Sequence, residues 1–149
     1  MKKTVTWVVV ADHQHGHAFQ NDGPNRGLQP VDGFSFETHL HFGRDLISDR
    51  PTRTFSRADG KPQAVEPKTD PHRQEGERFV AGMAAALAAA SDRGEFQRLL
   101  LIAPPRALGE FRRQLPPKVR DKIVAEIDQD LTQVPVDKIV AHVAPHLAV

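Results

Sequence analysis

Three histidines alternate near the start of the sequence, at positions 13, 15 and 17. On a β-strand this spacing places His13, His15 and His17 on one face, about 7 Å apart along the strand. Imidazoles arranged in this way are suited to sharing a metal ion such as zinc. A zinc site usually takes a further ligand from elsewhere in the chain, and His39 and His41 are the candidates. A solvated strand face is the alternative interpretation, and both stay open.

Three carboxylates alternate in the same way in the stretch from Val124 to Leu131. A strand there would place Glu126, Asp128 and Asp130 on one face. Clustered carboxylates hold Mg²⁺ or Mn²⁺ for phosphoryl chemistry. Like charges at this spacing repel one another, so a dry face needs a metal ion or arginines, whereas a solvated face needs neither. Both interpretations remain open at this point.

The segment 43–73 has no hydrophobic periodicity and carries four prolines among many charges. A connection of this length is typical of a functional or a mobile loop. Arginines close to Phe42 and Phe55 suit phosphate groups and unstacked bases, which indicates an RNA-facing loop. The interleaved acids favour a second interpretation, a solvated loop that pairs with itself. Ser48 and Thr69 lack a histidine and a carboxylate at interpretable spacing, so no catalytic nucleophile is predicted.

The first forty residues read as an antiparallel meander. Thr4 to Ala11 is rich in β-branched and aromatic residues, which predicts a buried strand. The turn signal Asn21-Asp22-Gly23-Pro24 then separates a short extended segment at His17 to Gln20 from a further strand at Leu28 to Phe36.

Helices and strands alternate in the second half. Asp70 and Pro71 suit the N-cap and first position of a long helix that Gly94 ends. The apolar run Leu99 to Ala103 predicts a strand covered on both faces. Further elements are predicted as a helix from about Pro105, a turn from Pro116, a strand at Val124 to Leu131 and a helix from about Pro135. This order favours crossover connections and parallel pairing, so we expect an α/β fold with a mixed sheet of about five strands covered by helices.

Composition narrows the classes of protein. The 149 residues fit one domain, numbered 1–149, and hydrophobic residues make up 39% of them. A formal net charge of +1 gives no general reason to bind nucleic acid or membranes, so such binding must come from a local patch. The absence of cysteine excludes disulfides and thiolate chemistry. The apolar run near the start breaks at Asp12, so we expect no signal peptide, no membrane insertion and a cytoplasmic location.

Four stretches resemble the bacterial host attachment proteins, in the same order along the chain. They are Asp45–Pro51 with Arg53 and Phe55, Glu66–Pro71 leading to Phe79, Ala103–Arg106 with Leu108 and Gly109, and Glu126–Thr132. That family is similar to the central domain of archaeal and eukaryotic-type peptide-chain release factors, which implies an RNase H-like sheet and contact with ribosomes. The release factor places Gly-Gly-Gln just before a long helix, whereas this chain reads His72-Arg73-Gln74-Glu75-Gly76. We therefore carry over no peptide-release activity.

Two functional hypotheses follow. The first is a non-enzymatic binding module that contacts RNA, the ribosome or a protein partner through the segment 43–73 and the entrance of the long helix. Its candidate binding residues are Asp49, Arg50, Arg53, Phe55, Thr69, Asp70, Arg73, Arg78 and Arg106. The alternative is a divalent-metal-dependent phosphodiesterase or nuclease that uses Glu126, Asp128 and Asp130. The sequence favours the non-enzymatic role, and no cofactor is predicted.

A third, structural hypothesis concerns the alanine-rich part of the long helix. Ala84, Ala85, Ala86 and Ala88 permit close packing, so a partner chain could cover this helix in an oligomer.

Overall fold

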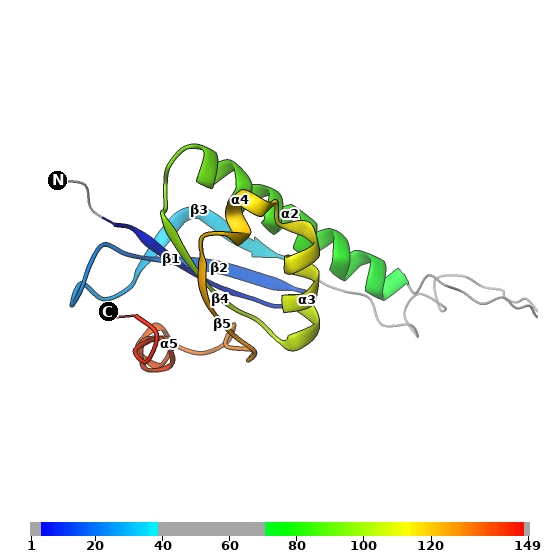
Figure 1. The fold of residues 1–149 in the computed structure, drawn as a ribbon. Helices are drawn as coiled ribbons and strands as arrows, with labels where there is room; N and C mark the ends of the chain where they lie inside the picture. The colour runs from blue at the N-terminus through cyan, green and yellow to red at the C-terminus, as the bar shows by residue number, and fades with distance from the viewer. Residues whose placement is uncertain (1–3, 39–70, 148–149) are drawn as a thin grey trace, which may run out of the picture.

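The structure, a computed structural model, describes residues 4–38 and 71–147 of the chain (Figure 1). Its elements are β1 Thr6–Ala11, β2 His15–Asn21, β3 Gln29–Glu37, α2 Pro71–Asp92, β4 Arg98–Ile102, α3 Pro105–Gln114, α4 Pro117–Arg120, β5 Ile123–Ile127 and α5 Val136–Val143. Most of the segment 43–73 lies outside the described residues, so the interpretations of that segment stay predictions. No helix in the described ranges is long and apolar enough to cross a membrane.

The strands form one mixed sheet in the order β3-β2-β1-β4-β5. β1 pairs antiparallel with β2 on one side, where Val8 lies opposite Phe19. On its other side β1 pairs parallel with β4, where Val8 lies opposite Leu100. β2 pairs antiparallel with β3, and β4 pairs parallel with β5. The structure therefore confirms the predicted antiparallel meander of β1, β2 and β3 and the predicted parallel pairing in the second half of the chain. It also confirms the α/β fold with a mixed sheet of five strands.

Helices cover both faces of the sheet, and the central strand is buried on both sides. Trp7 and Val9 of β1 belong to a core cluster with residues of α2, α3 and α4. Val8 and Val10 point the other way, into a second cluster with residues of α5. Figure 1 shows α5 on the side of the sheet opposite to the other three helices. Because side chains alternate along a strand, successive residues at the end of β1 are directed to opposite faces.

The long helix α2 packs closely on the meander strands. Val80, Met83 and Leu87 are fully buried at helical spacing. Gly16 of β2 permits this approach, because a Cβ atom there would lie 2.2 Å from the Met83 Sδ. Phe79 meets the ring of Phe36 on β3 edge to face, with the ring centroids 6.4 Å apart. These contacts fix where the first turns of α2 lie relative to the sheet.

The alanines of α2 do not form one exposed face. Ala84 is buried in the core, while Ala86 and Ala88 are half-buried against it. Of the four, Ala85 alone is exposed. The helix α2 therefore uses three of these small side chains to approach its own sheet, and an oligomer formed through this helix stays a prediction.

The last strand is shorter than predicted, ending at Ile127 instead of continuing to Leu131. Asp130 Oδ1 accepts the Thr132 amide at 3.1 Å, and this side-chain bond competes with extended pairing. Leu131 is buried in the cluster that contains α5, so the chain turns there toward the far face of the sheet. Gly94, at φ 73°, follows the end of α2 as predicted, since glycine adopts this backbone conformation without strain.

Candidate functional site

The carboxyl ends of β1, β4 and β5 meet at one edge of the sheet, which we call the carboxyl edge. The strands end there at Ala11, Ile102 and Ile127. β3 runs in the same direction as β1 and also ends at this edge, and α3 begins there. In open α/β sheets, ligands bind beside the carboxyl ends of the parallel strands. The carboxyl edge is therefore the first place to look for functional side chains.

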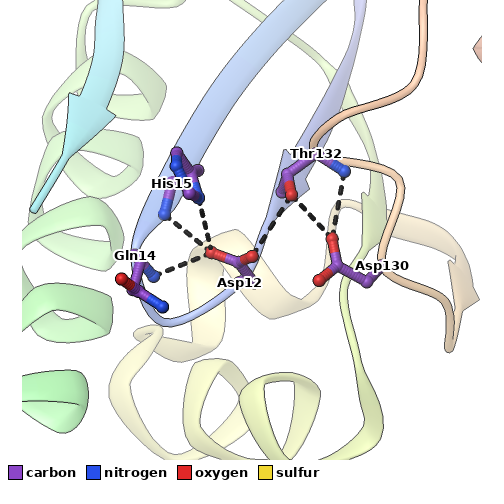
Figure 2. Close-up of polar contacts among 5 residues, drawn as sticks. All are labelled: Asp12, Gln14, His15, Asp130 and Thr132. Atoms are coloured by element: carbon purple, nitrogen blue, oxygen red, sulfur yellow. Dashed lines mark hydrogen bonds and ion pairs between the residues drawn. The ribbon is translucent and has the colours of Figure 1, made fainter. Parts of the chain in front are cut away.

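Asp12, the first residue after β1, is the centre of a polar cluster at the carboxyl edge (Figure 2). The cluster includes Thr132, whose neighbour Leu131 packs with residues of α5. Asp12 Oδ1 accepts the backbone amides of Gln14 and His15, both at 2.7 Å. Its Oδ2 lies 3.2 Å from the Thr132 hydroxyl, which is also 2.7 Å from Asp130 Oδ1. The cluster thus connects the turn between β1 and β2 to the segment that follows β5.

The environment of Asp12 favours its ionised form. Burial by itself would raise the pKa of this carboxyl group. Hydrogen bonds from the Gln14 and His15 amides, the charge of His15 and the Asp130 side chain together outweigh burial, so the pKa of Asp12 lies below its ordinary value. With its oxygens already bonded within the chain, Asp12 acts chiefly to hold the turn.

His13, the next residue, is bonded on the opposite face of the sheet. Its Nε2 lies 2.5 Å from Oε1 of Glu110 on α3. The Glu110 side chain is only 3% exposed, while that of His13 is 23% exposed. Arg113 approaches the other Glu110 oxygen at 3.9 Å. A buried carboxylate needs such partners, because an unpaired charge in the protein interior is strongly unfavourable.

α2 supports the same imidazole from its other side. A Cβ atom at Gly76 would lie 2.9 Å from the His13 Cδ2 and 3.2 Å from its Cγ, closer than packed atoms normally come. Gly76 therefore lets the ring lie directly on the helix. His13 is held between α2 and Glu110 of α3, at the carboxyl edge.

The histidine prediction fails in its geometry. His15 and His17 are on β2, but His13 lies before that strand and is directed to the other face. His15 Nδ1 lies 3.4 Å from Asp12 Oδ1, while His13 is bonded to Glu110. The three imidazoles cannot line one strand face, because the chain turns between positions 12 and 15. His39 and His41 lie outside the described residues.

The three predicted carboxylates are also separated, because β5 ends at Ile127. Glu126 is paired with Arg112, whose pKa is raised by that hydrogen bond and charge. Glu126 and Asp128 do line one pocket of about 400 Å³ together with His146. Asp130 is instead bonded to the Thr132 hydroxyl. In residues 4–38 and 71–147 no group of three or more metal-ligating side chains could hold an ion.

The predicted binding residues divide into two sets. Those outside the described residues are Asp49, Arg50, Arg53, Phe55, Thr69 and Asp70. Arg73 is described and pairs with Glu77 at 3.6 Å. Arg78 and Arg106 are exposed, and neither makes an ion pair within the described part of the chain. Arg78 lines a pocket of about 460 Å³ between α2 and α3 whose other lining residues are Gln74, Glu77, Ala81 and Gln114.

Asp12, Glu110 and Thr132 were missed by sequence reasoning. Asp12 carried a signal, because a charged residue directly after a buried strand marks the carboxyl end of that strand. Glu110 carried none, since a glutamate among arginines on a helix ordinarily lies on the solvated face.

Comparison with known proteins identifies the family to which the chain is similar. The model of a family whose members are proteins required for attachment to host cells matches residues 7–143. No curated protein matches the sequence.

Two solved structures share part of the fold at low identity. An archaeal translation termination factor, aRF1, is 10% identical with a TM-score of 0.46, covering 86% of this chain and 31% of that one. An archaeal protein is 7% identical with a TM-score of 0.49, covering 97% of this chain and 35% of that one. The chain thus spans about a third of the length of each. The family match covers most of the sequence, and this chain belongs to the host attachment family.

Proposed function

We propose that this protein is a binding module that contacts RNA, free or within a ribosome, at the carboxyl edge and the adjoining turns of α2 and α3. The supporting observation is the contrast among the arginines of this region. Arg73 and Arg113 each lie beside a carboxylate, at 3.6 Å from Glu77 and 3.9 Å from Glu110. Arg78 and Arg106 are exposed and form no ion pair in the described ranges.

Guanidinium groups without an acidic partner among residues 4–38 and 71–147 are suited to phosphate. Arginine presents a planar array of donors that matches two phosphate oxygens, and it stays charged at every physiological pH. Because the formal net charge of the chain is only +1, attraction to RNA has to come from local groups such as these. The pocket beside Arg78 adds the amides of Gln74 and Gln114, which can donate to and accept from base edges.

The proposed role connects to the family description indirectly. A protein that binds RNA can alter attachment to host cells through the synthesis of surface components. No adhesive contact by this chain itself is required for that effect.

Salt-dependent binding tests the proposal. A fluorescent single-stranded RNA of mixed sequence is titrated with the protein at several salt concentrations, and anisotropy gives the dissociation constant. Arg78→Ala and Arg106→Ala should each weaken binding and lower the slope of log K against log salt by about 0.7, the value for one phosphate contact on single strands. Arg98→Ala is the matched control, since Arg98 is also exposed but begins β4 at the opposite edge.

Two results would contradict the proposal. One is the absence of RNA binding at low salt. The other is an RNA affinity that stays unchanged in both arginine variants, because RNA would then bind at a different surface of the protein. If the protein binds an acidic protein but does not bind RNA, the alternative of a protein partner is favoured.

A metal-dependent phosphodiesterase is the second candidate. One observation favours it: Glu126 and Asp128 line the same pocket with His146. The pairing of Glu126 with Arg112 argues against a metal-dependent activity, because the guanidinium group is bonded to the carboxylate oxygens that a metal ion would need as ligands. Calorimetry with Mn²⁺ tests it, and a binding heat that disappears in Asp128→Asn would support it. The absence of any heat with Mg²⁺ or Mn²⁺ would remove it.

A further inference from the structure

A small pocket of about 140 Å³ lies at the edge of the sheet opposite to the carboxyl edge, where β1 and β4 begin and β2 ends. A cavity of roughly 150 Å³ holds benzene, so this pocket has room for a ligand of about six non-hydrogen atoms. It is too small for a nucleotide. The residues that line it are Thr4, Thr6, Asn21, Gly23, Pro24, Arg98 and Leu147.

Three of the lining residues lie side by side on neighbouring strands. Thr6 of β1 lies opposite Asn21 of β2 on one side and is paired with Arg98 of β4 on the other. Residues paired in this way direct their side chains to the same face of the sheet, and adjacent strands are about 4.8 Å apart. The Thr6 hydroxyl and the stem of the Arg98 side chain are therefore neighbours in the wall of the pocket.

The Thr6 hydroxyl is directed to this pocket. Thr6 is only 2% exposed, yet its hydroxyl forms no hydrogen bond with any residue that the structure describes. It is not one of the buried side-chain atoms that are shut off from solvent without a partner. The pocket is thus the place where this hydroxyl meets solvent, and a ligand there can accept its proton.

Asn21 gives the pocket a fixed wall. Its side chain is buried, and its Nδ2 donates to the Gly27 carbonyl oxygen at 2.8 Å. Its Oδ1 accepts the Gly23 amide at 3.2 Å. These two bonds hold the turn after β2 against the start of β1, so the pocket is formed before any ligand binds.

The charges at the pocket favour an anion. Arg98 is exposed and forms no ion pair within residues 4–38 and 71–147. None of the residues that line the pocket is acidic. A guanidinium group offers two parallel donors that match the oxygens of a carboxylate. Leu147, which is 8% exposed, and Pro24 add apolar surface, which favours a ligand with a hydrocarbon tail.

We infer that this pocket binds a small monocarboxylate with a short hydrocarbon tail. Arg98 pairs with the carboxylate, Thr6 donates to one of its oxygens, and the tail lies against Leu147 and Pro24. The site is separate from the proposed RNA contact, because it lies at the opposite edge of the sheet and shares no residue with it.

A titration with sodium butyrate, followed by ¹H–¹⁵N correlation spectra at constant ionic strength, tests the inference. The amides of Asn21, Gly23 and Arg98 should shift and saturate. A dissociation constant on the order of 1 mM is expected, because so few ligand atoms contribute. 1-Butanol keeps the tail without the charge, and inorganic phosphate keeps a charge without the tail. Each should bind about tenfold more weakly or less.

Two variants test the named contacts. Arg98→Ala should weaken butyrate binding at least about tenfold, because it removes a charged hydrogen-bond donor. Thr6→Val keeps the shape of the side chain and removes the hydroxyl, so binding should weaken roughly three- to tenfold. Arg93→Ala is the matched control, since Arg93 is exposed and close in sequence to Arg98 but is bonded to Glu95 and does not line the pocket.

Three outcomes would overturn the inference. They are the absence of saturable shifts with butyrate, an unchanged affinity in Arg98→Ala, and phosphate binding as tight as that of butyrate. Arg98 is exposed, so its alanine variant should fold and decides alone if Thr6→Val does not fold. RNA takes no part in this titration, so its failure leaves the proposed RNA binding intact, and the absence of RNA binding leaves this site intact.

Discussion

The Thr132 hydroxyl lies 3.2 Å from Asp12 Oδ2, although the two residues are 120 positions apart in the chain. This contact joins the end of β1 to the segment after β5, across the end of the intervening β4. The same hydroxyl is 2.7 Å from Asp130. One side chain therefore connects the two outer parallel strands at the edge where we place the ligand.

Thr132→Val should destabilise the protein by about 1 kcal/mol, because it removes the hydroxyl proton that the Asp12 and Asp130 carboxylates share. Thr132→Ser keeps the hydroxyl and is the control. Urea unfolding followed by circular dichroism gives both free energies of unfolding. Equal stability of the valine and serine variants would show that the contact is not formed.

The lowered pKa of Asp12 predicts a pH-dependent contribution to stability. The folded pKa lies below the ordinary value of 3.8, so the unfolded chain binds the proton more readily than the folded protein does. The stabilisation is complete above that value and is lost as the pH falls from there through the lower folded pKa.

Asp12→Asn keeps an oxygen that accepts amide hydrogens and removes the titration. Unfolding free energies of the wild-type protein and this variant, measured between pH 7 and pH 2.5, should converge at the acid end. A difference that stays constant over the whole range would contradict the lowered pKa.

Two glycines on α2 make a matched pair. At Gly76 a Cβ atom would lie 2.9 Å from the His13 ring, whereas at Gly82 it would meet nothing within 4 Å. Gly82→Ala should stabilise the protein by about 0.5–1 kcal/mol through helix propensity. Gly76→Ala should destabilise it by about 1 kcal/mol net, because displacement of the ring outweighs the same gain. Thermal unfolding of both variants decides, and a stabilising Gly76→Ala would show that the ring does not lie on the helix.

Two ion pairs at the same helix should respond differently to truncation. His13→Ala leaves the Glu110 carboxylate buried with only Arg113 nearby, at 3.9 Å, and should cost about 3 kcal/mol. Arg112→Ala removes the ion pair with Glu126, but the Arg112 side chain is exposed, so the free energy of unfolding should change little. Chemical denaturation measures both. If the two variants lose similar free energies of unfolding, the Glu110 carboxylate is accessible to solvent and not buried.

Most of the fold was predictable because its signals are local. Proline at the first position of α2, the glycine after its end and the apolar run of β4 each specify an element without information from the rest of the chain. β5 was overextended because the alternation of Val124 to Leu131 continues past the strand. Leu131 is buried against α5 instead, a tertiary contact that no local pattern reveals.

The candidate site was only partly predictable. Arg78 and Arg106 were identified as cations, but the sequence does not reveal that both lack an acidic partner within the described residues, because that depends on which neighbours the fold brings close. The alternating histidines suggested one shared face, whereas the turn at Asp12 directs His13 to α3 and leaves His15 beside Asp12. Glu110 is buried because it lies opposite His13, a pairing of residues 97 positions apart.

Chemical-shift mapping of the ¹⁵N-labelled protein with a short single-stranded RNA tests the central claim most directly. The account predicts that the perturbed amides gather at the carboxyl edge, near Gln14, Gly76 and Arg106, and that the Arg98 end of the sheet stays unperturbed. Perturbations gathered instead around Asn21 and Arg98, or no perturbation at low salt, would contradict it.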